Sequence, residues 1–218
     1  QNGLDVGCGA GLSTKALRLI CDRVTGTDIS EQMIQVCQEE YKNDKAYTFY
    51  RAKAEETKEP VEKYDIVTAA GMVNWVDRDL FLRNMGCVLR DQGILLIYDF
   101  WITDKMQGND SYTNWYQNEY LKRFPKPPRN ETIWKQEELP DDFQIKNQIT
   151  YELAYDFSME QFIDFMMIQS NVNIKLESGA VNEKNARDWL KKSLTPVFEN
   201  REKTLYFKGY NWYIYKLG

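Results

Sequence analysis

Residues Leu4 to Gly11 read LDVGCGAG, and this motif carries most of the information about the fold. A short apolar run typical of a buried strand leads into three glycines, and apolar residues at helical spacing follow from Leu12. Glycines let a backbone approach a ligand closely, and the first turn of a helix offers free N–H groups. A strand, a glycine turn and a helix in this order predict a nucleotide-type ligand at the end of the first strand.

The following residues alternate strand and helix patterns. Strands are predicted at 23–28, 47–51, 64–70 and 93–100, with helices at 30–41 and about 79–89. This rhythm indicates right-handed βαβ units on a parallel sheet, which binds ligands at the carboxyl ends of its strands. The residues just after each strand are therefore the candidate site residues.

The spacing of the glycines narrows the type of ligand. A dinucleotide-binding turn would read GxGxxG, but the sixth position counted from Gly7 is Leu12. Asp28 ends the second predicted strand, where its carboxylate can accept hydrogen bonds from both hydroxyls of a ribose. The alternative for Asp28 is to cap the helix that starts near Ser30. A nicotinamide-dependent oxidoreductase stays open as a hypothesis that the glycine spacing disfavours.

These motifs resemble those of class I S-adenosylmethionine (SAM)-dependent methyltransferases. The likeness covers about Gly3 to Phe100 and is strongest to the methyltransferase type 11 group, which includes trans-aconitate and ubiquinone-biosynthesis enzymes. It implies SAM as the cofactor and S-adenosylhomocysteine as the product. It also implies a set of cofactor-binding residues, with Ile29 and Met33 beside the adenine: Asp5, Gly7, Cys8, Gly9, Gly11, Asp28, Ile29, Met33, Ala54, Glu55, Ala70 and Gly71.

Two positions depart from the family pattern. Lys53 stands where an acidic or small residue often precedes Ala-Glu, and Asn74-Trp75 replaces His-Trp. The chain has no histidine, so imidazole cannot serve as a base. We expect Asn74 and Trp75 to position the acceptor, with anchoring of the core as the alternative for Trp75.

From Trp101 onward the resemblance is thin. Residues 101–142 are rich in aromatic residues and predict a helical lid inserted after the fifth strand. Its candidate substrate-binding residues, which could instead pack the lid on the sheet, are Trp101, Trp115, Tyr116 and Tyr120. The final run KTLYFKGYNWYIYK, 203–216, predicts a hairpin that turns at Lys208-Gly209.

The predicted fold class is α/β. We expect a Rossmann-like, seven-stranded, mostly parallel sheet with helices on both faces, a C-terminal antiparallel hairpin and the helical lid. The chain is predicted to be one domain, with a SAM-binding half at 1–100, the insertion at 101–142 and a C-terminal part at 143–218. We also expect a native segment to precede Gln1 and to help close the SAM site.

The amino-acid composition of the chain limits the kinds of partner that it can bind. The net charge of −5 argues against a nucleic-acid backbone, and no apolar run approaches the ~20 residues of a membrane-spanning helix. The four cysteines have no CxxC spacing, which predicts neither a metal site nor disulfides and favours the cytoplasm. We expect a monomer or homodimer that acts on a small molecule.

The predicted function is methyl transfer from SAM by in-line displacement. Without histidine, the favoured acceptor is an oxygen or nitrogen nucleophile that needs no imidazole base, with a carboxylate among the candidates. The alternative from another class is a SAM-binding protein without transferase activity, in a regulatory or assembly role.

Overall fold

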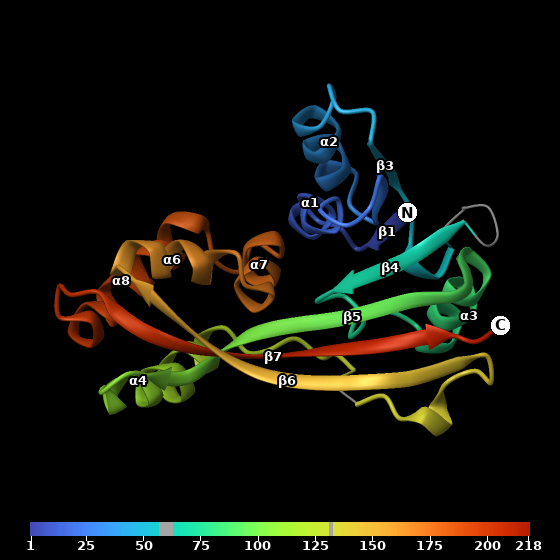
Figure 1. The fold of residues 1–218 in the computed structure, drawn as a ribbon. Helices are drawn as coiled ribbons and strands as arrows, with labels where there is room; N and C mark the ends of the chain where they lie inside the picture. The colour runs from blue at the N-terminus through green and yellow to red at the C-terminus, as the bar shows by residue number, and fades with distance from the viewer. Residues whose placement is uncertain (57–62, 131–132) are drawn as a thin grey trace. The chain divides into compact units, whose positions relative to one another are not determined.

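The computed structural model describes residues 1–56, 63–130 and 133–218. In these residues seven strands form a sheet in the order β3-β2-β1-β4-β5-β7-β6 (Figure 1). The strands are β1 (Asn2–Val6), β2 (Arg23–Asp28), β3 (Tyr47–Arg51), β4 (Tyr64–Ala70), β5 (Leu89–Met106), β6 (Phe143–Phe157) and β7 (Lys203–Lys216). The helices are α1 (Leu12–Leu17), α2 (Glu31–Glu40), α3 (Arg78–Val88), α4 (Asp110–Trp115), α5 (Leu121–Arg123), α6 (Met159–Met167), α7 (Ser170–Glu177) and α8 (Glu183–Phe198). Shorter helical turns are η1 (Ala54–Glu56), η2 (Tyr116–Tyr120) and η3 (Gln136–Glu138).

The order in which the chain adds strands to the sheet reverses between β1 and β4. Strand β1 pairs in parallel with β2 on one side and with β4 on the other. The chain runs outward from β1 to β3 and then returns to start again at β4, which pairs in parallel with β5. Right-handed crossovers in opposite directions place α1 and α2 on one face and α3 on the other. The predicted Rossmann-like, mostly parallel sheet with helices on both faces is confirmed.

The chain divides into two compact units. Unit 1 comprises 1–100, 130–150 and 210–218, and unit 2 comprises 101–129 and 151–209. The main core of unit 1 includes Leu4, Val67, Phe81 and Ile97. The border at Phe100–Trp101 coincides with the end predicted for the SAM-binding half. That the three predicted parts make a single domain stays a prediction.

The hairpin predicted at Lys208-Gly209 is wrong, because β7 runs unbroken through both residues. Gly209 is needed for another reason: a Cβ built on it would lie 2.5 Å from the ring of Tyr151 on β6. The antiparallel C-terminal pair is formed by β7 and β6. Contacts of Leu217 with Asp142, Gly209 with Tyr151 and Thr204 with Asp156 run in opposite directions along the two strands.

The helical part of the insertion predicted at 101–142 is present as α4, η2 and α5, and its middle turn is π-helical. It packs within unit 2 against residues of α6 and α8. That this segment acts as a lid stays a prediction. None of the helices in the described part of the chain has the length and apolar character needed to span a bilayer.

Candidate cofactor site

The glycine turn after β1 has a backbone that only glycine adopts easily. Gly7, Gly9 and Gly11 have φ angles of 70°, 51° and 87°. Gly11 is also enclosed, because a Cβ there would lie 3.2 Å from both the Cys37 sulfur and the Tyr41 ring. The turn therefore brings the backbone close to β2 and α2 before α1 begins at Leu12.

The side chain of Asp5 stabilises the position of this turn. Its side chain is fully buried and accepts hydrogen bonds from the hydroxyls of Ser13 (2.5 Å), Thr14 (2.6 Å) and Thr68 (2.8 Å). Burial raises the pKa of Asp5, and the three hydroxyls oppose that rise. Asp5 thus links β1 to the start of α1 and to β4. It supports the site by fixing the backbone of the glycine turn.

Asp28 connects the glycine turn to the start of α2. Its two carboxylate oxygens accept the N–H groups of Gly9 (2.9 Å) and Ser30 (2.8 Å). The Ser30 side chain caps α2 itself, by accepting the N–H of Met33. Each carboxylate oxygen of Asp28 keeps a second lone pair, so the carboxylate can still accept two hydroxyls.

Beside Asp28, apolar side chains are open to solvent. Ile29 is 61% exposed and Met33 is 38% exposed. The backbone at Ile29 is held by Arg51, whose Nε donates to the Ile29 carbonyl at 2.9 Å. The sequence pattern gave no sign of this role for Arg51, because the contact joins the ends of two strands that are far apart in the chain.

The turn η1 after β3 is fixed by two hydrogen bonds. Asn84 of α3 donates to the carbonyl of Ala54 at 2.9 Å, and Glu55 accepts the N–H of Asp77 at 3.1 Å. Glu55 therefore spans from η1 to the start of α3 and is more than a solvated charge. The role of Asn84 was missed, since an asparagine inside a helix carries no local signal of such a contact.

These elements surround a cavity of about 420 Å³ at the switch point of the sheet. Eight of the predicted site residues line it: Gly7, Asp28, Ile29, Ala54, Glu55, Ala70, Gly71 and Trp75. Ala52, Lys53, Met72 and Val76 complete the lining. Five residues predicted to bind cofactor lie outside it and support or border the turn and α2: Asp5, Cys8, Gly9, Gly11 and Met33.

The two candidate positioning residues have different environments. Trp75 is 48% exposed and lines the cavity, which fits a contact with a bound molecule better than anchoring of the core. Asn74 does not line the cavity, and its carbonyl accepts the N–H of Asn130 at 3.1 Å.

Cys8 has the properties of a packing residue. It is 4% exposed, and burial raises the pKa of its thiol well above the ordinary range. Among the described residues no group of Cys, Asp or Glu side chains is arranged to hold a metal ion.

The aromatic residues predicted to bind substrate are mostly inside unit 2. Trp115 and Tyr120 are 1% exposed and stack with ring centroids 5.4 Å apart. Their polar atoms bond to Ser193 (2.9 Å) and Asn171 (3.1 Å). Tyr116 is also buried, whereas Trp101 is 40% exposed. Packing, the alternative considered for these rings, describes the surroundings of Trp115, Tyr116 and Tyr120.

The parallel sheet with its switch point, the glycine turn and the carboxylate after β2 define the Rossmann-like fold of class I methyltransferases. Comparison with known proteins agrees with this class. Residues 4–97 match the family model described as a methyltransferase domain. This part of the chain is therefore similar to a methyltransferase domain.

The similar proteins carry the same description. A ubiquinone biosynthesis O-methyltransferase of Pelagibacter ubique is 30% identical over 95 residues, which are 43% of this chain and 40% of that protein. One from Bradyrhizobium diazoefficiens is 32% identical over 95 residues, 43% of this chain and 38% of that protein. The chain thus spans less than half the length of these curated relatives.

Solved structures show the likeness of the fold. A candidate type II methyltransferase from Anaeromyxobacter dehalogenans superposes with a TM-score of 0.71 at 20% identity, covering 99% of this chain and 88% of that one. A candidate methyltransferase from Bacillus halodurans gives 0.59 at 18% identity, covering 100% and 93%. Unit 2 therefore has counterparts in fold as well, although the family model ends at residue 97.

Proposed function

We propose that this protein transfers the methyl group of SAM to a small-molecule acceptor. The observation that carries the proposal is the cavity of about 420 Å³ at the switch point, lined by residues that follow β1, β2, β3 and β4. In open α/β sheets this crevice is where ligands bind. The match of residues 4–97 to a methyltransferase domain supports SAM as that ligand.

The chemistry of the lining fits SAM. The free lone pairs of Asp28 suit the two hydroxyls of a ribose, and the exposed Ile29 offers an apolar surface for adenine. Gly71 has a φ of 64° and lies at the end of β4, where a side chain would crowd the Asp99 carboxylate at 3.3 Å. We assign the methionine part of SAM to the backbone around Ala70 and Gly71, and the adenine edge to Ala54 and Glu55.

SAM supplies a methyl group that its sulfonium charge has already activated. In the proposed reaction, a lone pair of the acceptor forms the new bond to the methyl carbon while the carbon–sulfur bond breaks, and that electron pair goes to sulfur. The residues around the cavity have to hold the nucleophile in line and exclude water. Trp75 is the lining residue that we assign to this task, and no histidine is required.

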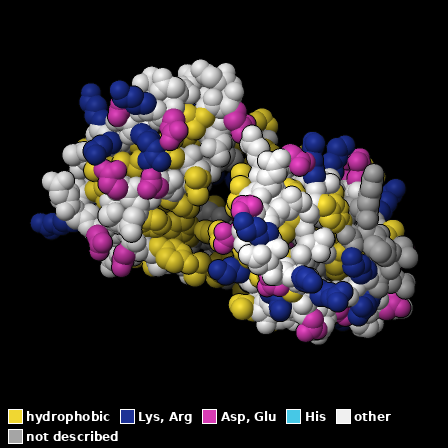
Figure 2. All heavy atoms as spheres, turned by 90° about the horizontal axis from the view of Figure 1, so that it is seen from above, with side chains coloured by type: hydrophobic (Ala, Val, Ile, Leu, Met, Phe, Trp, Pro, Cys, Tyr) yellow, Lys and Arg dark blue, Asp and Glu magenta, His cyan; other side chains and the backbone are white. Residues whose placement is uncertain are grey.

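Several features support a small-molecule acceptor with an oxygen or nitrogen nucleophile. The face shown in Figure 2 intermixes Lys and Arg with Asp and Glu, and no part of it is covered by basic groups alone. The named relatives of residues 4–97 include ubiquinone biosynthesis O-methyltransferases. All four cysteines are unpaired, which supports a reducing compartment such as the cytoplasm.

Calorimetric titration with S-adenosylhomocysteine tests the donor site. We expect saturable binding, a loss of roughly tenfold or more in affinity for Asp28→Ala, and little change for Glu31→Ala, which removes a nearby carboxylate outside the cavity. No binding at millimolar ligand would overturn the proposal. Binding without methylation of any acceptor in a broad panel would instead favour a SAM-binding protein without transferase activity.

A further inference from the structure

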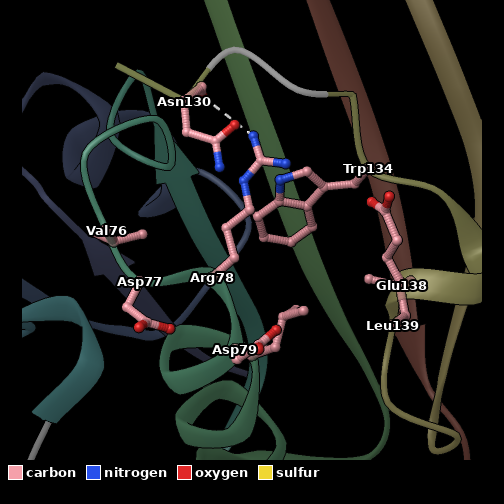
Figure 3. A pocket seen from close by; sticks show the side chains of 9 residues that line it. Val76, Asp77, Arg78, Asp79, Asn130, Trp134, Glu138 and Leu139 are labelled. Atoms are coloured by element: carbon pink, nitrogen blue, oxygen red, sulfur yellow. Dashed lines mark hydrogen bonds between the residues drawn. The ribbon is translucent and has the colours of Figure 1, made fainter. Parts of the chain in front are cut away.

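A second cavity, of about 450 Å³, lies at the start of α3 in unit 1. Figure 3 shows the side chains of α3 and of the segment before β6 meeting around it. Its lining residues are Val76, Asp77, Arg78, Asp79, Leu82, Asn130, Trp134, Glu138 and Leu139. It shares Val76 with the cavity at the switch point, and the proposed function makes no use of its other residues.

Arg78 lines this cavity, and most of its donors have no hydrogen-bond partner among the described residues. Its guanidinium carbon is 5.1 Å from the centre of the Trp134 ring, and one terminal nitrogen donates to the Asn130 carbonyl at 3.2 Å. Its Nε is buried and makes no hydrogen bond. Burial lowers the pKa of Arg78, and no described carboxylate forms an ion pair with it. A partly buried guanidinium in this state favours an incoming anion.

Trp134 contributes a second unused donor. Its Nε1 is buried without a hydrogen-bond partner among the described residues, and the ring is 2% exposed between Phe81 and Trp212. Both Arg and Trp side chains donate hydrogen bonds and accept none. Two such donors in one cavity favour a ligand rich in hydrogen-bond acceptors. The guanidinium turns toward that ligand when it binds.

The acidic residues around the cavity limit the charge of that ligand. Asp77 caps α3 by accepting the N–H of Leu80 at 3.0 Å, and Glu138 accepts the N–H of Lys135 at 3.3 Å. Asp79 lies in the first turn of α3, and its side chain makes no hydrogen bond or ion pair with another described residue. Three carboxylates near one guanidinium would repel a dianion more strongly than a monoanion, so the bidentate contact with Arg78 has to outweigh less repulsion for a single negative charge.

We propose that this cavity binds a small monocarboxylate with an apolar body, through Arg78. The carboxylate accepts a bidentate hydrogen bond from the guanidinium, which stacking on Trp134 holds in a fixed plane. The apolar body lies against Val76, Leu82 and Leu139. This site is additional to the SAM cavity and does not depend on the proposed methyl transfer.

Benzoate serves as the probe, and the indole N–H resonance of Trp134 in a ¹⁵N-labelled full chain is the readout. Trp134→Phe assigns the resonance among the six tryptophans. We expect a saturable shift with benzoate, binding roughly tenfold weaker for the neutral isostere benzamide, and no tighter binding for the dianion phenyl phosphate. Arg78→Gln should lose benzoate binding, Arg78→Lys should weaken it, and the control Arg83→Gln, exposed on the same helix, should retain it.

Three results would overturn the proposal: no saturable shift with benzoate, equal affinity for benzoate and benzamide, or unchanged affinity in Arg78→Gln. Binding of S-adenosylhomocysteine, measured on the same samples, confirms that each variant is folded around the donor site. It also separates the two proposals, because loss of donor binding in the wild type with benzoate binding retained would contradict only the proposed methyl transfer. If Arg78→Gln does not fold, the comparison of benzoate with benzamide on the wild type decides alone.

Discussion

The two units use their polar and aromatic side chains in different ways. In unit 1, the side chains around the cavity bond to backbone groups: Asp28 to the N–H groups of Gly9 and Ser30, and Glu55 to that of Asp77. In unit 2, the rings of Trp115 and Tyr120 pack against one another, and each has one polar partner. These polar residues of unit 1 therefore fix the shape of loops, whereas these aromatic residues of unit 2 form part of a core.

The largest effect that this comparison predicts is on the stability of unit 2. Trp115→Ala leaves a cavity among Tyr112, Tyr120 and Phe162 and frees the Ser193 hydroxyl, so the free energy of unfolding should fall by about 3–5 kcal/mol. Urea denaturation measures it. Ile168→Ala, at a side chain that is 70% exposed in the same unit, should stay within about 0.5 kcal/mol. If the Trp115→Ala variant is as stable as the wild type but no longer binds the acceptor, the Trp115 ring belongs to the substrate site.

Asp5 gives the corresponding test for unit 1. Asp5→Ala leaves the hydroxyls of Ser13, Thr14 and Thr68 without their acceptor, so we expect a loss of about 2–3 kcal/mol in the free energy of unfolding. Binding of S-adenosylhomocysteine should weaken as the turn loosens. A stability loss of this size with donor affinity unchanged would show that the turn keeps its shape without Asp5.

The same residue predicts a pH dependence. Burial raises the pKa of Asp5 in the folded state above its ordinary value of 3.8. The folded state therefore holds this proton when the unfolded chain has lost it, and the stabilisation from it is full below pH 3.8 and fades as pH rises through the folded pKa. Relative to Asp5→Asn, which does not titrate, the wild type should lose stability as the pH rises above 3.8 and through the raised pKa of the folded state. A constant difference between the two proteins over that range would contradict the raised pKa.

The contrast between the units also explains how far the sequence could be read. The turn at 4–11, Asp28 and the strand ends of unit 1 depend on residues close together in the chain, and eight of the predicted residues line the cavity. Arg51 and Asn84 were missed because their contacts, to Ile29 and Ala54, join distant segments. The sequence around Trp115 is equally consistent with a ring that lines a pocket and a ring that packs in a core, so the burial of Trp115 could not be predicted from the sequence.

A smaller effect is expected at the glycine turn, where two positions form a matched pair. Gly11→Ala forces a side chain into a φ of 87° and to 3.2 Å from the Cys37 sulfur, and should cost about 2 kcal/mol. Gly9→Ala also meets a positive φ, of 51°, but its Cβ has no atom within 4 Å, so about 1 kcal/mol is expected. Thermal denaturation of both variants measures the difference. Equal losses would mean that strain of the backbone alone governs the turn.

The smallest effect is predicted at Glu55, where shape and charge can be separated. Glu55→Gln keeps an oxygen that can accept the N–H of Asp77, so the free energy of unfolding should change by less than about 0.5 kcal/mol. Glu55→Ala removes that acceptor and should cost about 1 kcal/mol. If Glu55 acts on the donor mainly by holding the backbone, the affinity for S-adenosylhomocysteine should fall in the alanine variant and stay within about threefold in the glutamine variant. An equal fall in both would instead assign the effect to the carboxylate charge, and Glu55 would then contact the ligand directly, as proposed for Asp28.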